Sequence, residues 1–126
     1  MNTPGNFSVV VQDQLIRVDL QGQWTVADDR EYLIELMNAF HMAKNAPWGM
    51  LVDMRGWQID DALKEFKHEH VFHLDRRNQK AECWIVDDDN QGDHLAHYLE
   101  SAEIPLQRCH DVNTAQQWLT LYGFKL

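Results

Sequence analysis

The segment GMLVDM, residues 49–54, restricts the folds that this chain can adopt more than any other feature of the sequence. It is a short and nearly continuous apolar run, which is typical of a strand that is covered on both faces. Strands of this kind occur in α/β proteins, in which helices pack on both sides of a largely parallel sheet. The run therefore predicts a central strand, with helical segments before and after it in the sequence.

The residues before this run predict a hairpin and then a helix. Residues 7–11, FSVVV, are rich in β-branched side chains, and after a short polar turn apolar and polar residues alternate strictly over residues 16–21. Two strands joined by so short a turn form an antiparallel hairpin. The apolar spacing then becomes helical, from a capping-box pattern of Thr25 and Asp28 to about Asn45.

The same alternation of strand and helix continues to the end of the chain, as judged by the period of the apolar residues. The expected segments are a helix that Asp60 or Asp61 caps, a strand over residues 81–87, a helix that follows Gly92, a strand over residues 105–109, and a helix that Asn113 caps.

These segments predict a single domain, residues 1–126, of the α/β class. We expect a mixed five-stranded sheet with helices packed on it, in the order β-β-α-β-α-β-α-β-α. With 126 residues, of which 44% are hydrophobic, the chain can form a stable hydrophobic core without disulfide bonds or bound metal ions. Cys83 and Cys109 lie in apolar segments, which favours reduced core thiols over a disulfide or redox pair.

The charge of the chain argues against two classes of partner. The formal net charge is −9, whereas nonspecific binding to nucleic acid or to an anionic membrane needs a surplus of Lys and Arg. No apolar run is long enough to span a bilayer. The first residues, MNTPGNFS, lack the charged and apolar regions of a signal peptide, so a cytoplasmic location is expected.

The order of elements and two short motifs resemble a known family. The motifs are GMLVDMRGW, a strand that ends in Asp before a loop that leads to a helix, and KAECWIVDDD, a strand that ends on acids. Together they resemble the SpoIIAA-like or STAS fold of anti-sigma-factor antagonists, and most closely the STAS/SEC14-type proteins of bacteria. The resemblance covers roughly residues 7–121. It implies a non-catalytic regulatory module that binds a protein partner or a small apolar ligand.

The chain departs from that family at its regulatory position. The antagonists carry a phosphorylatable Ser in the loop and helix start after the central strand. The matching segment here reads IDDAL, and no Ser or Thr occurs in residues 48–66, so a kinase-controlled switch is not expected. Asp60 and Asp61 could mimic a phosphorylated state, but their interpretation as helix N-caps is favoured.

The carboxyl ends of the parallel strands predict where a site would lie, because open α/β sheets bind ligands there. Asp53, Arg55 and Trp57 follow the central strand, and we take them with Asp60 and Asp61 as the candidate binding residues. Trp and Arg dominate interface hot spots, which makes Arg55 and Trp57 candidate anchors for a protein partner. A core position is the favoured alternative for Trp57. The later strand ends add Asp87, Asp88, His110 and Asp111.

Catalytic and metal patterns are incomplete in this sequence. The segment HEHVFH places Phe72 where the zinc motif HExxH needs its second His, and a calcium loop from Asp87 would place Tyr98 where a Glu is needed. We therefore expect no enzyme activity, no metal and no cofactor. An enzyme or metal protein that uses His and Asp at the strand ends is the alternative. A homodimer joined by an apolar helix face is also left open.

Overall fold

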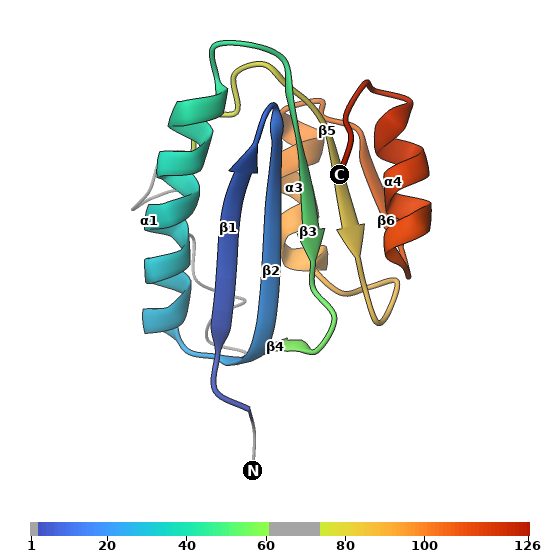
Figure 1. Cartoon of the computed structure of the whole chain (residues 1–126). Coiled ribbons are helices and arrows are strands. Elements are labelled where there is room, and N and C mark those ends of the chain that lie inside the picture. Colours follow the sequence, from blue (N-terminus) through green and yellow to red (C-terminus); the bar gives the residue numbers. More distant parts are fainter. Residues whose placement is uncertain (1–2, 61–73) are drawn as a thin grey trace.

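The computed structural model describes residues 3–60 and 74–126, and within them the chain forms one mixed sheet of six strands (Figure 1). The order across the sheet is β1-β2-β3-β5-β6, and β4 pairs with β2. The first pair is antiparallel and the other pairs are parallel. The strands are β1 (Asn6–Gln12), β2 (Leu15–Trp24), β3 (Trp48–Asp53), β4 (Trp57–Ile59), β5 (Gln79–Ile85) and β6 (Leu106–Cys109).

Three helices within the described residues cover the two faces of the sheet. They are α1 (Val26–Ala43), α3 (Asp93–Ser101) and α4 (Val112–Thr120). The first two pack on one face and α4 packs on the other (Figure 1). None of the three is both long and apolar enough to cross a lipid bilayer. The helix predicted after Asp60 falls on residues 61–73, which lie outside the described residues.

The mixed α/β fold is confirmed, but the prediction of five strands was wrong by one. The unpredicted strand, β4, pairs with residues 22–24 at the end of β2. Only residues 15–19 of β2 pair with β3, so the last residues of this long strand need other partners for their backbone groups. Gly22, at φ 76°, lies where the pairing changes, and its N–H donates to the Gly56 carbonyl at 3.1 Å.

The helix starts follow from their capping side chains. The capping box predicted for α1 is confirmed: the Asp28 N–H donates to Thr25 Oγ1 at 3.3 Å, and the Thr25 N–H donates to Asp28 Oδ2 at 2.9 Å. The cap predicted for α4 was wrong. Asp111, and not Asn113, has the extended backbone of an N-cap, and its carboxylate accepts the Thr114 N–H at 2.7 Å.

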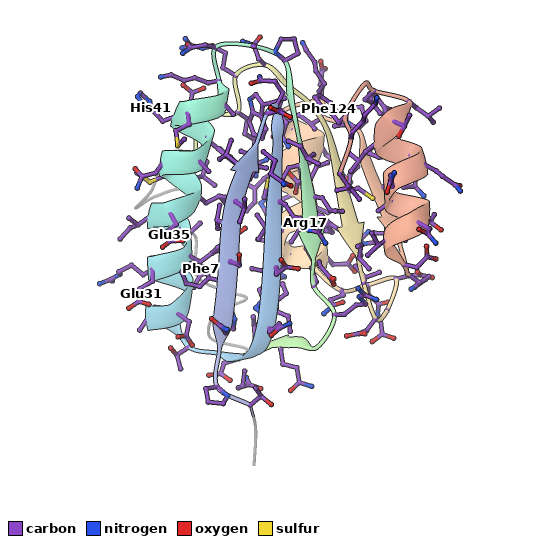
Figure 2. All side chains as sticks on the ribbon, in the orientation of Figure 1. Phe7, Arg17, Glu31, Glu35, His41 and Phe124 are labelled. Carbon is purple, nitrogen blue, oxygen red and sulfur yellow. The ribbon has the colours of Figure 1, made fainter. Side chains whose placement is uncertain are left out.

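The sheet separates two hydrophobic clusters, and β3 contributes to both. Val52 packs on the side of α1 and α3, whereas Leu51 packs on the side of α4, and each is at most 2% exposed. The prediction of a central strand buried on both faces is therefore confirmed. Phe124, after α4, closes the second cluster over Gly49 (Figure 2). A Cβ at Gly49 would lie 2.7 Å from the Phe124 ring, which explains the glycine at the start of GMLVDM.

The two cysteines belong to the cluster under α4. Cys83 and Cys109 are both free and buried, with their Sγ atoms 3.7 Å apart. Burial raises the pKa of the Cys83 thiol, and the neighbouring Cys109 adds to this effect. A protonated thiol in an apolar cluster is a poor nucleophile, in agreement with the favoured interpretation as core thiols.

Candidate functional site

The loop after β3 holds an ion pair between two of the predicted site residues. Arg55 donates from Nε to Asp53 Oδ1 at 3.0 Å and from Nη2 to Asp53 Oδ2 at 2.8 Å. The backbone N–H of Arg55 also donates to Asp53 Oδ1, at 3.1 Å. Burial of Asp53, the largest single influence, acts to raise its pKa, but the hydrogen bonds and positive charge of Arg55 outweigh it and leave the pKa below its ordinary value. Asp53 and Arg55 thus provide each other with hydrogen-bond partners and an opposite charge.

Replacing Arg55 by glutamine is expected to raise the pKa of Asp53, because the variant lacks the two hydrogen bonds and the positive charge of the guanidinium. The carboxyl carbon shift of Asp53, followed by NMR during an acid titration, measures the change. Since the folded-state pKa is depressed, ionised Asp53 contributes stability at pH values above the unfolded pKa of about 3.9, and this stability is lost as the pH falls through the folded-state pKa.

Arg17→Gln serves as the control for this titration, because Arg17 lowers the pKa of Asp53 through its charge alone and is the smallest of the influences on it. It should move the Asp53 titration less than Arg55→Gln does. An Asp53 pKa that is unchanged in Arg55→Gln would show that the ion pair does not form in solution.

The loops after β3 and β5 are joined by hydrogen bonds. Asp87 accepts the Gly56 N–H at 2.7 Å. Gln91 donates from Nε2 to the carbonyls of Met54 at 2.7 Å and Trp57 at 3.1 Å, and its Oε1 accepts the Asp87 N–H at 2.9 Å. These polar groups hold the loops in place, and they are engaged with the protein itself.

The ends of the later strands are also occupied by local contacts. His110 Nε2 lies 3.1 Å from Asp89 Oδ1, and His110 Nδ1 lies 3.0 Å from the Val86 carbonyl oxygen. The Asp111 carboxylate accepts the backbone and side-chain groups of Thr114, which lowers the pKa of Asp111. Asp88 is exposed. Within the described residues, no group of three or more His, Cys, Asp or Glu is placed to hold a metal ion.

Of the remaining candidate binding residues, Trp57 and Asp60 lie in different environments. Trp57 is only 7% exposed and packs edge-on against Trp24, with ring centroids 5.4 Å apart. Asp60 is exposed, and its carboxylate accepts Gln23 Nε2 at 2.7 Å. Asp61 lies outside the described residues. Trp57 thus belongs to the interior of the domain, whereas Asp53 and Arg55 lie at its surface loop.

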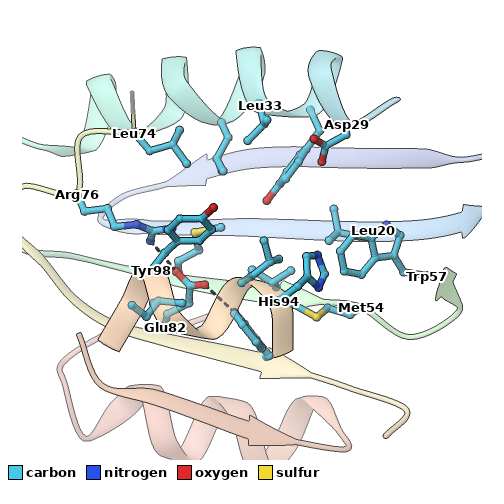
Figure 3. Close-up of a pocket in the computed structure, with 17 residues that line it drawn as sticks. Leu20, Asp29, Leu33, Met54, Trp57, Leu74, Arg76, Glu82, His94 and Tyr98 are labelled. Carbon is cyan, nitrogen blue, oxygen red and sulfur yellow. Dashed lines mark hydrogen bonds and ion pairs between the residues drawn. The ribbon is translucent and has the colours of Figure 1, made fainter. Parts of the chain in front are cut away.

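The interior behind Trp57 contains a cavity of about 60 Å³ between α1, the sheet and α3 (Figure 3). Its walls are mainly aliphatic, from Leu33 and Leu36 of α1, Met50 and Val52 of β3, and Leu95 of α3. A few polar side chains also line it, namely Asp29, Tyr32, Arg76, Glu82, His94 and Tyr98. Trp57 and His94 line both this cavity and an open groove outside it, so they form the wall between the two.

A buried carboxylate, Glu82, organises the polar side of the cavity. It is 3% exposed and accepts three hydrogen bonds, of which Figure 3 shows those from Arg76 and Trp84. Its Oε1 accepts Gln79 Nε2 at 2.8 Å and Arg76 Nη1 at 3.2 Å, and its Oε2 accepts Trp84 Nε1 at 2.6 Å. The Arg76 guanidinium also lies over the Phe40 ring, 5.3 Å from its centroid. A charge this deeply buried is tolerated only with such a set of partners.

The polar cluster around Glu82 was missed from the sequence, although the sequence carries a signal for it. In the strand AECWIV, the even positions Glu82, Trp84 and Val86 face one side of the sheet. A lone acid inside so apolar a strand must find donors, and Arg76 stands just before the strand. Burial, reinforced by the charge of Glu82, raises the pKa of the nearby Tyr32, so its hydroxyl stays neutral.

Comparison with known proteins identifies no relative of this chain: no family model, no curated protein and no solved structure matches it.

Proposed function

We propose that this chain is a non-catalytic binding module, of the SpoIIAA-like kind that its sequence resembles, and that it holds a small, largely apolar ligand in the cavity between α1, the sheet and α3. The observation that carries this proposal is the cavity itself. It has aliphatic walls and a few converging polar groups, which is the usual composition of a ligand site. The STAS/SEC14 resemblance, which admits a small apolar ligand, supports the same function.

The size of the cavity limits the ligand. Its volume is about 60 Å³. An apolar cavity of roughly 150 Å³ takes up benzene, so the space here suits a molecule of only a few non-hydrogen atoms, or one end of a longer molecule. Trp57 and His94 separate this space from the groove outside, which gives a longer ligand a direction in which to extend.

The chemistry of the lining favours binding over catalysis. The described residues that line the cavity include no Ser, Thr, Cys or Lys, and its Asp29, His94 and Tyr98 side chains already interact with other groups of the protein. The carboxylate of Glu82 is engaged with three donors and is thereby held as a structural group.

Binding of a protein partner at the loop after β3 has less support. The two anchors that this function would use are Trp57 and Arg55. Trp57 is buried, and the guanidinium of Arg55 is bound to Asp53. An interface hot spot needs a side chain that is exposed and free to contact a partner, and neither Trp57 nor Arg55 meets both conditions.

Xenon, a spherical apolar probe, tests the proposed cavity site in solution. Under xenon pressure, the amide and methyl NMR shifts of residues that line the cavity should change, because apolar cavities of this kind take up the gas. Leu33→Phe fills the cavity from α1 and should abolish these changes. The matched control is Ile34→Phe, since Ile34 is the next residue of α1 and is 47% exposed.

The proposed function is contradicted if xenon leaves the lining residues unaffected, or if its effect persists unchanged in Leu33→Phe. Thermal unfolding of both variants shows whether each retains the fold. If Leu33→Phe does not fold, Leu95→Phe fills the same cavity from the half-buried face of α3.

A further inference from the structure

The indole N–H of Trp57 is a buried hydrogen-bond donor in the wall of the cavity. Its Nε1 is fully buried and has no hydrogen-bond partner among the described residues. The same holds for Arg76 Nε, which belongs to the cluster around Glu82. Buried N–H groups without an acceptor are rare, because each loses its hydrogen bonds to water on folding. Both side chains line the same cavity.

The other tryptophans show how unusual Trp57 is in this chain. Of the five Trp residues, three place Nε1 on a protein acceptor. Trp24 donates to the Gln21 carbonyl at 2.9 Å, Trp48 to the Arg77 carbonyl at 2.7 Å, and Trp84 to Glu82 at 2.6 Å. Trp118 is half-buried, so Trp57 is the buried tryptophan whose indole N–H has no acceptor among the described residues.

The charge of the cavity restricts what kind of acceptor fits there. Among the described residues, two buried acids, Asp29 at 6% and Glu82 at 3% exposure, line it together with the guanidinium of Arg76. An anionic ligand would bring a further negative charge beside Asp29 and Glu82 in a poorly screened interior. A cationic N–H group would bring another donor and no acceptor. An uncharged oxygen satisfies the indole N–H without either penalty.

The two unsatisfied donors belong to side chains at opposite ends of the cavity. Figure 3 shows Arg76 and Trp57 at opposite ends of the cavity, with Tyr98 and His94 between them. Arg76 already has the carboxylate of Glu82 beside it, whereas no acceptor among the described residues meets Trp57 Nε1.

We infer that the ligand of this cavity is a small uncharged molecule with a carbonyl or ether oxygen, which accepts a hydrogen bond from Trp57 Nε1 while its apolar part packs among the aliphatic walls. This inference rests on the proposed function, because it requires that the cavity be the binding site. It makes Trp57 the residue that selects an oxygen-bearing ligand over a hydrocarbon of the same shape.

Acetone and 2-methylpropene form a matched pair of probes for this inference. They have the same shape, and the second carries a CH₂ group where the first carries its oxygen. The indole N–H resonances of ¹⁵N-labelled protein report on each Trp separately, and loss of one resonance in Trp57→Phe assigns that of Trp57. Acetone should move the Trp57 resonance downfield, whereas 2-methylpropene should not. The resonances of Trp24 and Trp48 serve as internal controls, because their N–H groups already have acceptors and their side chains are not among those that line the cavity.

The affinities of the two probes provide the second readout. Trp57→Phe should weaken acetone binding by about two- to tenfold, the range expected from one neutral hydrogen bond. Binding of 2-methylpropene should change much less, so the ratio of the two affinities isolates the hydrogen bond from the change in cavity size. Trp118→Phe, on the opposite side of the sheet, should leave both affinities unchanged.

Two results would overturn the inference, and they differ in what they say of the proposed function. If both probes affect the lining residues, but the Trp57 resonance stays in place and Trp57→Phe changes both affinities equally, the cavity binds ligands without selecting an oxygen. A water molecule that already accepts the indole proton would give this result. If neither probe affects the lining residues, the inference fails, and a negative xenon experiment then removes the proposed function as well.

Discussion

Truncation of Trp57 to alanine is expected to lower the free energy of unfolding by about 3–5 kcal/mol, the usual cost of removing a large buried aromatic side chain. Trp57 is 7% exposed and packs edge-on against Trp24. It also begins β4, the strand that completes the end of β2, so its loss disturbs packing and pairing together. Urea denaturation monitored by circular dichroism measures the change.

The matched variant for this prediction is Trp57→Phe, which keeps an aromatic ring against Trp24 and should retain most of the stability. Stability that is nearly unchanged in Trp57→Ala would contradict a core role. It would restore the interpretation of Trp57 as an exposed anchor for a protein partner, which the sequence alone leaves open.

Replacement of Arg76 by methionine is expected to destabilise the protein by about 3–5 kcal/mol, because it leaves a buried carboxylate without its charged partner. Glu82 is 3% exposed, and the Arg76 side chain is 16% exposed, so solvent screens the pair weakly. Gln79 and Trp84 still donate to Glu82 in this variant, but neither carries a charge. The loss is measured by the same denaturation experiment.

Arg77→Met is the control for the Arg76 variant, since it makes the same change at the neighbouring position. The Arg77 side chain is 67% exposed and lies 3.9 Å from Asp75, and substitutions at such surface positions usually change stability by no more than about 0.5 kcal/mol. Equal effects of the two substitutions would show that the buried pair contributes nothing beyond the loss of a long side chain.

Most of the described elements could be predicted because each depends on a local pattern. Alternation over residues 16–21, the capping box at Thr25 and the apolar run of GMLVDM each specify one element without reference to the rest of the chain. β4 could not be found in this way. It has only three residues, and it forms because residues 22–24, some 35 positions earlier, need partners. The cap of α4 was placed two residues too late because Asp111 and Asn113 are both good N-caps.

The candidate site was less predictable than the fold because it is a property of packing. The rule of strand ends selected Asp53 and Arg55, which bind each other. The cavity, in contrast, is lined from α1, α3, the sheet and residues 74–76, and no pattern along the sequence brings these together. Trp57 belongs to both sets, but a single Trp after a glycine has no periodicity that shows which way it points. The acid at position 82 was the one local signal of the buried cluster.

Because the sheet separates the interior into two clusters, side chains on one face share few contacts with side chains on the other. The cavity belongs to the cluster under α1 and α3, whereas Leu51, Cys83 and Leu119 form part of the cluster under α4. Substitutions that share no partners change stability additively, to within about 0.5 kcal/mol. The α4 face can therefore supply a constant reserve of stability while the residues of the cavity vary. A scaffold built in this way can change the shape of its cavity without redesign of what keeps it folded.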